Sequence, residues 1–71
     1  MKFNPYDYDY SYSEWEQIID ECVFGERNKN IVKRKLLDRI TFEELAEEKE
    51  MSSRQIQRIV DKALNKISKY I

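Results

Sequence analysis

Three segments of the chain carry the residue pattern that begins an α-helix. In each, a Ser or Thr is followed three residues later by Glu or Gln, which is the spacing of a capping box. The hydroxyl accepts a hydrogen bond from the third helical amide, and the longer side chain reaches back to the capping amide. A single Gly and a single Pro in the 71 residues favour helices with short connections. The three boxes are Ser13 with Glu16, Thr41 with Glu44, and Ser52 with Gln55.

The first two helices are predicted from apolar residues at helical spacing. The first is expected to start at Ser13 and to have Gly25 at the left-handed position that commonly ends a helix. The second is expected to run from Asn28 or Asn30 to Ile40. The apolar face of the first helix comprises Trp15, Ile18, Ile19, Cys22 and Val23.

Two further helices follow the second and third capping boxes. A short helix is expected within residues 41–51, and the longest helix within residues 52–71. We therefore expect an all-α fold, a small bundle of about four helices. The apolar face of the longest helix comprises Ile56, Ile59, Val60, Ala63, Leu64 and Ile67.

Residues 1–12 are expected to form an extended acidic arm ahead of a helical domain at 13–71. The stretch YDYDYSY has a tyrosine at every second position, but no other segment offers a partner strand, and an isolated strand is not stable. Disordered tails are usually poor in aromatic residues, so some of the tyrosines, with Phe3, are expected to pack on the helices. Three roles stay open for the arm: packing, screening of a basic surface, and contact with another protein.

Several classes of function find no support in the residue types. One Cys and no His exclude an internal disulfide and the usual zinc patterns. The glutamates between positions 43 and 50 fit a solvated helix face, and there is no Gly-rich phosphate loop or nucleophile–base pair, so we expect no enzyme, no metal and no cofactor. The start of the chain has no apolar core of a signal peptide, and no apolar run spans a membrane. A cytoplasmic protein without membrane contact is expected.

The charge of the chain is divided unequally along its length. Residues 1–26 carry a net charge of −6, and residues 27–71 carry +5. Such asymmetry between the two halves of a chain indicates a polyanionic partner for the basic half.

The third and fourth predicted helices have the spacing of a helix-turn-helix. About three residues separate them, and the small Ala46 permits a close crossing. In this motif the first turns of the second helix face the major groove of DNA. The residues expected to fill the angle between the two helices are Leu45, Met51, Ile56 and Ile59.

The fourth predicted helix carries side chains suited to DNA. Arg pairs with guanine, Gln with adenine and Ser with either, while Lys and Arg at four-residue steps neutralise phosphates. The same cations also fit the solvated face of an ordinary amphipathic helix, and near a C-terminus they favour the helix dipole. Lys33, Arg34 and Lys35 of the second helix would add contacts to the DNA backbone. The candidate DNA-binding residues are Ser52, Ser53, Arg54, Gln55, Gln57, Arg58, Lys62 and Lys66.

The segment ITFEELAEEKEMSSRQIQRIVDKALNKI resembles region 4 of sigma-70-type RNA polymerase factors. It is more similar still to small sigma-like helix-turn-helix proteins of phages and prophages from Gram-positive bacteria. The resemblance covers residues 26–71 and implies a DNA-binding transcription regulator whose recognition helix starts at Ser52. It implies double-stranded DNA as the partner. The acidic half leaves RNA polymerase or another protein open as a partner, and burial of Trp15 between two copies leaves a homodimer open. The matching positions are Phe42, Glu43, Glu44, Leu45, Ala46, Glu47, Glu48, Met51, Ser52 and residues 54–58.

Two positions depart from the family pattern. Lys49 and Glu50 stand where the family has an apolar residue and a glycine. The turn must therefore differ, or Glu50 must adopt a positive φ, which is uncommon for a residue with a side chain. The alternative function is a helix-turn-helix scaffold that binds a protein, for instance a phage inhibitor that acts through its acidic N-terminal half.

Overall fold

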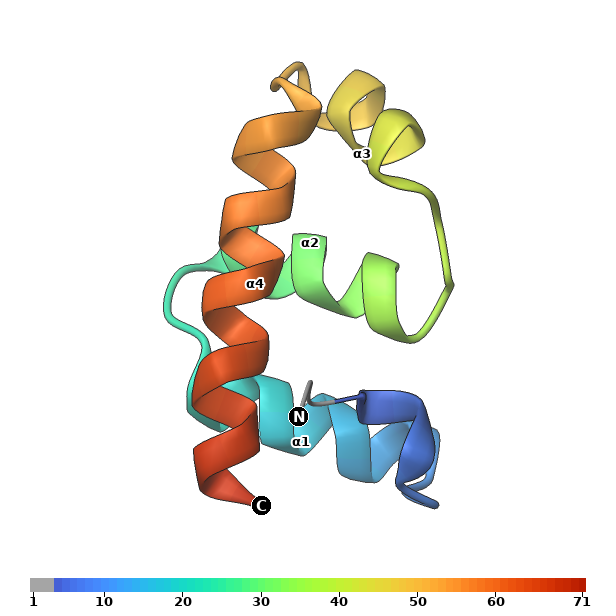
Figure 1. Ribbon diagram of the computed structural model, residues 1–71, viewed down its shortest axis with the longest axis vertical. Helices are drawn as coiled ribbons and strands as arrows, with labels where there is room; N and C mark the ends of the chain where they lie inside the picture. Colours follow the sequence, from blue (N-terminus) through green and yellow to red (C-terminus); the bar gives the residue numbers. More distant parts are fainter. Residues whose placement is uncertain (1–3) are drawn as a thin grey trace.

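Four α-helices make up the fold of residues 4–71, which the computed structural model describes (Figure 1). A 3₁₀ turn precedes them at Pro5–Asp7, and this part of the chain contains no strand. The expected all-α bundle of four helices is therefore confirmed. The helices are α1 (Tyr12–Cys22), α2 (Glu26–Leu36), α3 (Phe42–Lys49) and α4 (Ser53–Tyr70).

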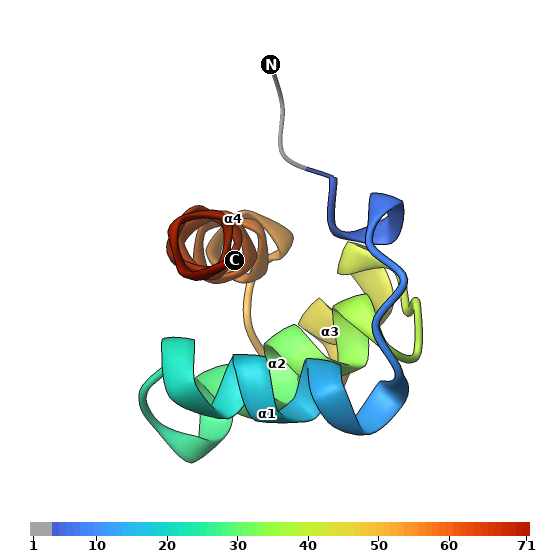
Figure 2. The ribbon, with the colours of Figure 1, turned by 90° about the horizontal axis from the view of Figure 1, so that it is seen from below.

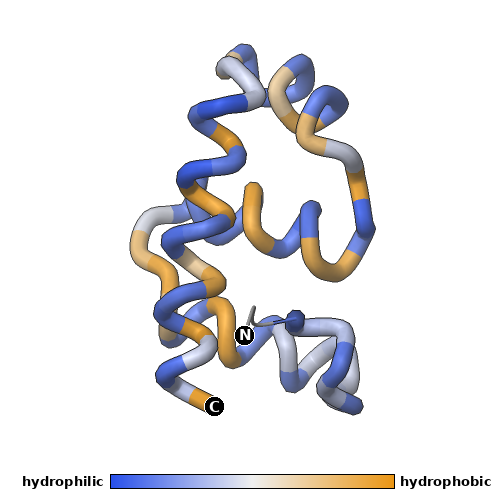
Figure 3. Tube along the Cα trace, in the orientation of Figure 1, coloured by the Kyte–Doolittle hydropathy of each residue, from blue (hydrophilic) through white to orange (hydrophobic). Residues whose placement is uncertain are grey.

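The longest helix, α4, forms one wall against which the other three pack. Figures 1 and 2 show α1 and α2 lying across α4, with α3 beside its N-terminal half. The apolar residues of α4 face α1, α2 and α3, and its opposite side is hydrophilic (Figure 3). This distribution is the amphipathic pattern that the sequence of α4 predicts.

Two hydrophobic clusters fill the space beneath α4. The first joins α1 and α2 to the C-terminal half of α4, and the second joins α2 and α3 to its N-terminal half. Ile59 and Leu64 pack against both clusters, so α4 connects them into one interior. The residues of α4 with no exposed surface include Ile56 and Ile67.

The capping boxes at Thr41 and Ser52 start α3 and α4 as predicted, although at Thr41 only the hydroxyl contact forms. The Thr41 hydroxyl accepts from the Glu44 amide at 3.2 Å. The Ser52 hydroxyl accepts from the Gln55 amide at 3.2 Å, and the Ser52 amide donates to the Gln55 side chain at 3.1 Å.

The predicted start of α1 at Ser13 is wrong, because a second capping box two residues earlier is used. Ser11 accepts from the Glu14 amide at 3.2 Å, and its own amide donates to the Glu14 carboxylate at 3.1 Å. This choice places Tyr10 just before the cap and Trp15 at the fourth helical position. Their rings meet edge to face with centroids 5.3 Å apart, which forms a hydrophobic staple that a start at Ser13 would lack.

The predicted boundaries of α2 and the role of Gly25 are also wrong. Val23, in extended conformation, ends α1, while Gly25, with φ +88°, directly precedes α2. A positive φ is easily adopted only by glycine, and glycine has no side chain to signal a cap. The helix therefore begins at Glu26 and not at Asn28 or Asn30. It ends before Ile40 because Arg39 takes a left-handed conformation with φ +55°.

The described part of the arm, residues 4–11, packs on α1 and α2. The backbone at Asn4 is extended, and the 3₁₀ turn follows, so the arm is not extended throughout. The Tyr6 hydroxyl donates to the Lys35 carbonyl at 3.4 Å, and the Arg39 guanidinium lies 4.7 Å from the Tyr6 ring centre. Tyr10 packs on Trp15, so the prediction that arm tyrosines lie against the helices is confirmed. The expectation for Phe3 lies outside the described residues.

Candidate nucleic-acid interface

The connection between α3 and α4 is a tight turn centred on Glu50. Glu50 has φ 55° and ψ 42°, the left-handed conformation. This is one of the two alternatives that the sequence left open, namely a positive φ at Glu50. Its amide donates to the Glu47 carbonyl at 3.4 Å, and the Met51 amide donates to the Ala46 carbonyl at 2.9 Å. These two bonds form the Schellman motif, in which glycine is the usual left-handed residue.

An apolar contact fixes how α3 lies against α4. Leu45 and Ile56 have no exposed surface, and Ala46, Met51 and Ile59 pack around them as predicted. Met51 precedes the cap of α4 and Ile56 occupies its fourth position, which is the arrangement of a hydrophobic staple. The first turns of α4 consequently extend past the core with their outward side in solvent.

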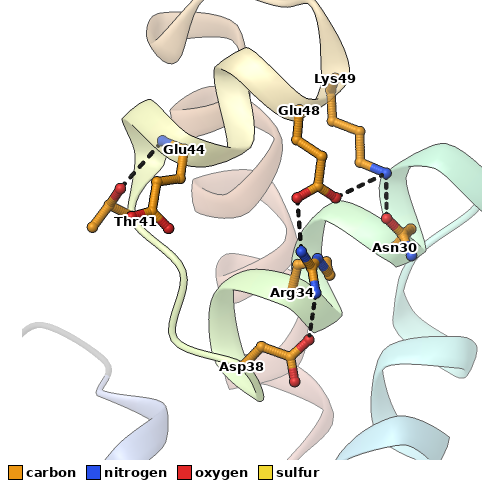
Figure 4. Close-up of polar contacts among 7 residues, drawn as sticks. All are labelled: Asn30, Arg34, Asp38, Thr41, Glu44, Glu48 and Lys49. Carbon is orange, nitrogen blue, oxygen red and sulfur yellow. Dashed lines mark hydrogen bonds and ion pairs between the residues drawn. The ribbon is translucent and has the colours of Figure 1, made fainter.

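Polar contacts attach α3 to α2 on its other side (Figure 4). The Arg34 guanidinium binds the Glu48 carboxylate at 2.7 Å and the Asp38 carboxylate at 3.2 Å. The hydrogen bond from Arg34 lowers the pKa of Glu48 and, in return, the bond to Glu48 raises the pKa of Arg34. Lys49 also reaches Glu48 at 3.8 Å and donates to the Asn30 side chain.

Lys33 and Lys35 of α2 are likewise engaged within the molecule. The Lys33 ammonium lies 2.9 Å from the Asp20 carboxylate of α1, and this hydrogen bond lowers the pKa of Asp20 and raises that of Lys33. The Lys35 ammonium lies 4.5 Å from the centre of the Phe42 ring. Lys33, Arg34 and Lys35 thus connect α2 to its neighbours, whereas Arg27 and Lys29, at the start of α2, form no ion pair with a carboxylate of the described chain.

The residues predicted for base contact all lie at the exposed start of α4, but they differ in availability. Ser52 and Gln55 are occupied with each other in the capping box. Ser53, Arg54 and Gln57 are exposed and, within residues 4–71, their side chains make no hydrogen bond. Fewer side chains are therefore available to contact bases than the sequence predicts, because Ser52 and Gln55 are used in the cap.

Behind these residues, α4 carries a cationic stripe, which consists of Arg54, Arg58, Lys62, Lys66 and Lys69. All five are exposed, and none forms an ion pair with a carboxylate of the described chain. Because four residues exceed one helical turn by about 40°, the stripe turns gradually around α4. At Lys66 it reaches the α1–α2 connection, where the ammonium lies 5.4 Å from the centre of the Phe24 ring.

A groove beside this stripe was missed by the sequence reasoning. It has a volume of about 350 Å³ and lies between the α1–α2 connection and the middle of α4. Phe24 borders it with 79% of its surface exposed. Phe24 has no place in the apolar spacing of α1 or α2, and that irregularity is the sequence signal that could have drawn attention to it.

The possible metal ligands of residues 4–71 are not clustered. No group of three or more His, Cys, Asp or Glu side chains is placed to hold a metal ion there. Cys22 is buried, and burial raises the pKa of its thiol. None of the described helices combines the length and apolar character needed to cross a bilayer.

Comparison with protein-family models, with curated proteins and with solved structures finds no match to the chain.

Proposed function

We propose that α3, the Glu50 turn and α4 act as a helix-turn-helix that binds double-stranded DNA, with α4 as the recognition helix. The observation that carries the proposal is the cationic stripe, whose members are exposed and unpaired with carboxylates of the described chain. Lys33, Arg34 and Lys35 of α2, in contrast, are bound to neighbouring helices. A stripe that the protein itself leaves uncompensated suits the phosphates of DNA.

Different parts of α4 would then have different tasks. Ser53, Arg54 and Gln57 lie in the first turns and are of the types that bond base edges in the major groove. Arg58 and Lys62 lie farther along and would neutralise phosphates. Ser52 would act by capping the recognition helix, together with Gln55.

The biological role in this proposal is transcription regulation of the sigma-like kind. This part rests on the resemblance of residues 26–71 to sigma region 4 and to small phage and prophage proteins. The exposed glutamates of α3 and of the turn after it restrict the geometry, since Glu43, Glu47 and Glu50 would repel phosphate. DNA would therefore approach α4 from the side that faces away from α3.

Titration of a fluorescent duplex with the protein at several salt concentrations tests the proposal. We expect binding that weakens as salt rises, and a salt slope lowered by about 2 in the Arg54→Gln/Arg58→Gln double variant, since each phosphate contact contributes about 0.9. Arg39→Gln, which removes one charge, is compared with the Arg54→Gln single variant, whose salt slope should fall by about 0.9. Arg39 is exposed but lies in the α2–α3 connection.

Absence of binding at tens of micromolar protein in low salt would refute the proposal. A loss of salt slope in Arg39→Gln equal to that in Arg54→Gln would also refute it, because the response would then reflect net charge and not the surface of α4.

A further inference from the structure

The groove between the α1–α2 connection and α4 combines an apolar floor with a cationic border. Its floor includes Val23, Ile59 and Ala63, and Cys22 lies at its α1 end. Val23 and Ala63 belong to the core cluster, so the floor is the outer surface of a packed interior. The groove is open to solvent and holds about 350 Å³, which is enough for side chains of a bound segment.

All the charge on the border of the groove is positive. Arg58, Lys62 and Lys66 contribute three cations from α4, and no carboxylate lines the groove. These cations are four residues apart, so they follow one another at about 6 Å along the helix. An acidic segment that lies along α4 would place carboxylates opposite them at the same spacing.

Phe24 provides the apolar part of the border. It is the most exposed large hydrophobic residue of the described chain, at 79%. Lys66 lies over one face of its ring, so the ring is bounded by charge on that side. Aromatic residues of this kind, placed at the edge of an apolar surface, are typical anchors of protein–protein contacts.

We propose that this groove binds an acidic amphipathic segment of a partner protein. Apolar side chains at helical spacing would occupy the floor beside Phe24, as in the helix-in-groove mode of recognition. Carboxylates on the flank of the segment would meet Arg58, Lys62 and Lys66. The opposite charge of border and segment selects the partner, and the apolar floor supplies the affinity.

The two other classes of ligand fit the groove less well. DNA would use the three cations but would leave Phe24 and the floor uncovered, since phosphates make no use of apolar surface. A small molecule would stay largely in solvent, whereas pockets for such ligands enclose most of the ligand surface. The groove shares Arg58 and Lys62 with the proposed phosphate contacts, but it differs from the surface proposed to read bases, because Arg54 does not line it and Phe24 lies on the α1–α2 connection.

The test uses a designed peptide of about 15 residues, which is long enough for several helical turns. It has Leu at helical spacing flanked by Glu, and a control peptide has every Glu replaced by Lys. Binding of both labelled peptides to the full chain is followed by fluorescence anisotropy, and amide NMR shifts locate the site. We expect the Glu peptide to bind, with the largest shifts at Phe24, Ile59 and Ala63.

Two variants separate this proposal from the DNA proposal. Phe24→Ser should weaken the Glu peptide about tenfold and leave DNA binding unchanged. Arg54→Gln should weaken DNA binding and leave the peptide unchanged. Because Phe24 is exposed, its replacement does not open the core, and circular dichroism of the variant checks that the fold is kept.

Three results would overturn the proposal: no binding of the Glu peptide at millimolar concentration, equal binding of the Lys peptide, or shifts centred away from the groove. A short DNA duplex that shifts Phe24 and Ala63, when the Glu peptide does not, would assign the groove to DNA and refute the protein partner. None of these results bears on whether the first turns of α4 bind DNA.

Discussion

At the residue scale, Glu50 is the position where the backbone is strained for its residue type. It is left-handed in the Schellman turn, where a side chain costs roughly 1–2 kcal/mol. Glycine removes this cost but loses part of the gain through the greater freedom of the unfolded chain. We expect Glu50→Gly to raise the free energy of unfolding by about 0.5–1 kcal/mol, measured by urea denaturation.

Glu50→Ala is the control for this prediction, because it removes the carboxylate and keeps the left-handed strain. A negative charge at the C-terminus of α3 opposes the helix dipole, so a gain of a few tenths of a kcal/mol is expected from Ala alone. An equal gain in Ala and Gly would show that charge, and not backbone conformation, destabilises the turn.

The sequence left the conformation of Glu50 open between two alternatives. The sigma-like proteins that residues 26–71 resemble have glycine at this position, so its absence required either a new turn or a positive φ, and the positive φ is found. At Gly25, the residue indicated a positive φ but not which helix it serves. The end of α1 depends on Val23 joining the core, and that burial is a property of the packed bundle.

At the scale of the helix, the start of α1 yields a paired prediction. Ser11 caps α1 and Ser13 lies exposed in its first turn. Ser11→Ala should lower the free energy of unfolding by about 1 kcal/mol through loss of the cap. Ser13→Ala should leave it unchanged or raise it slightly, because Ala favours helix interiors. Urea denaturation of both variants measures the difference, and a larger loss in Ser13→Ala would contradict the observed start.

Apolar periodicity predicts that these helices exist, but their ends depend on contacts between them. Both Ser11 and Ser13 have a Glu three residues later, so the box alone does not select one. The selection comes from Tyr10, which reaches Trp15 only when Ser11 is the cap. The hydroxyl contact of Thr41 and the full box of Ser52 were predicted correctly because each has a single box and an apolar residue just before the cap.

The sequence predicted which residues form the candidate interface on α4. It did not predict which of the predicted cations are available and which are bound within the molecule. Helical spacing indicates that Arg54, Arg58 and Lys62 share an exposed side of the helix. It does not indicate that Lys33 and Arg34 are bound to α1 and α3, because those partners are distant in sequence. The groove beside Phe24 was missed for the same reason, since its two sides come from separate helices.

At the scale of the whole molecule, the acidic arm and the cationic stripe lie apart. Figures 1 and 2 show the described arm beside the N-terminal end of α1, away from α4. Tyr6 and Tyr10 contact α1, α2 and the connection that follows α2. Of the three roles left open by the sequence, these contacts favour packing over screening of the stripe.

Deletion of residues 1–9 tests this division between arm and stripe. The deletion keeps Tyr10 and the Ser11 cap but removes the contacts of Tyr6 and the stacking of Tyr8 on Tyr10. We expect a loss of about 1 kcal/mol in the free energy of unfolding, the magnitude of an aromatic contact. DNA affinity near 0.15 M salt should stay within about twofold, since charges are screened over about 8 Å there and the molecule measures 30 × 26 × 19 Å.

The Asp7→Asn/Asp9→Asn variant completes this experiment, because it removes the negative charge of the arm and keeps every tyrosine. If the arm packs, this variant should match the unmodified chain both in urea denaturation and in duplex titration. If the arm screens α4, the variant and the deletion should both bind DNA more tightly, and the gain should shrink as salt rises. Tighter DNA binding by both the deletion and the double variant would therefore refute the packing role of the arm in favour of screening. A loss of stability that occurs only in the deletion would support the view that the contacts of Tyr6 hold the arm in place.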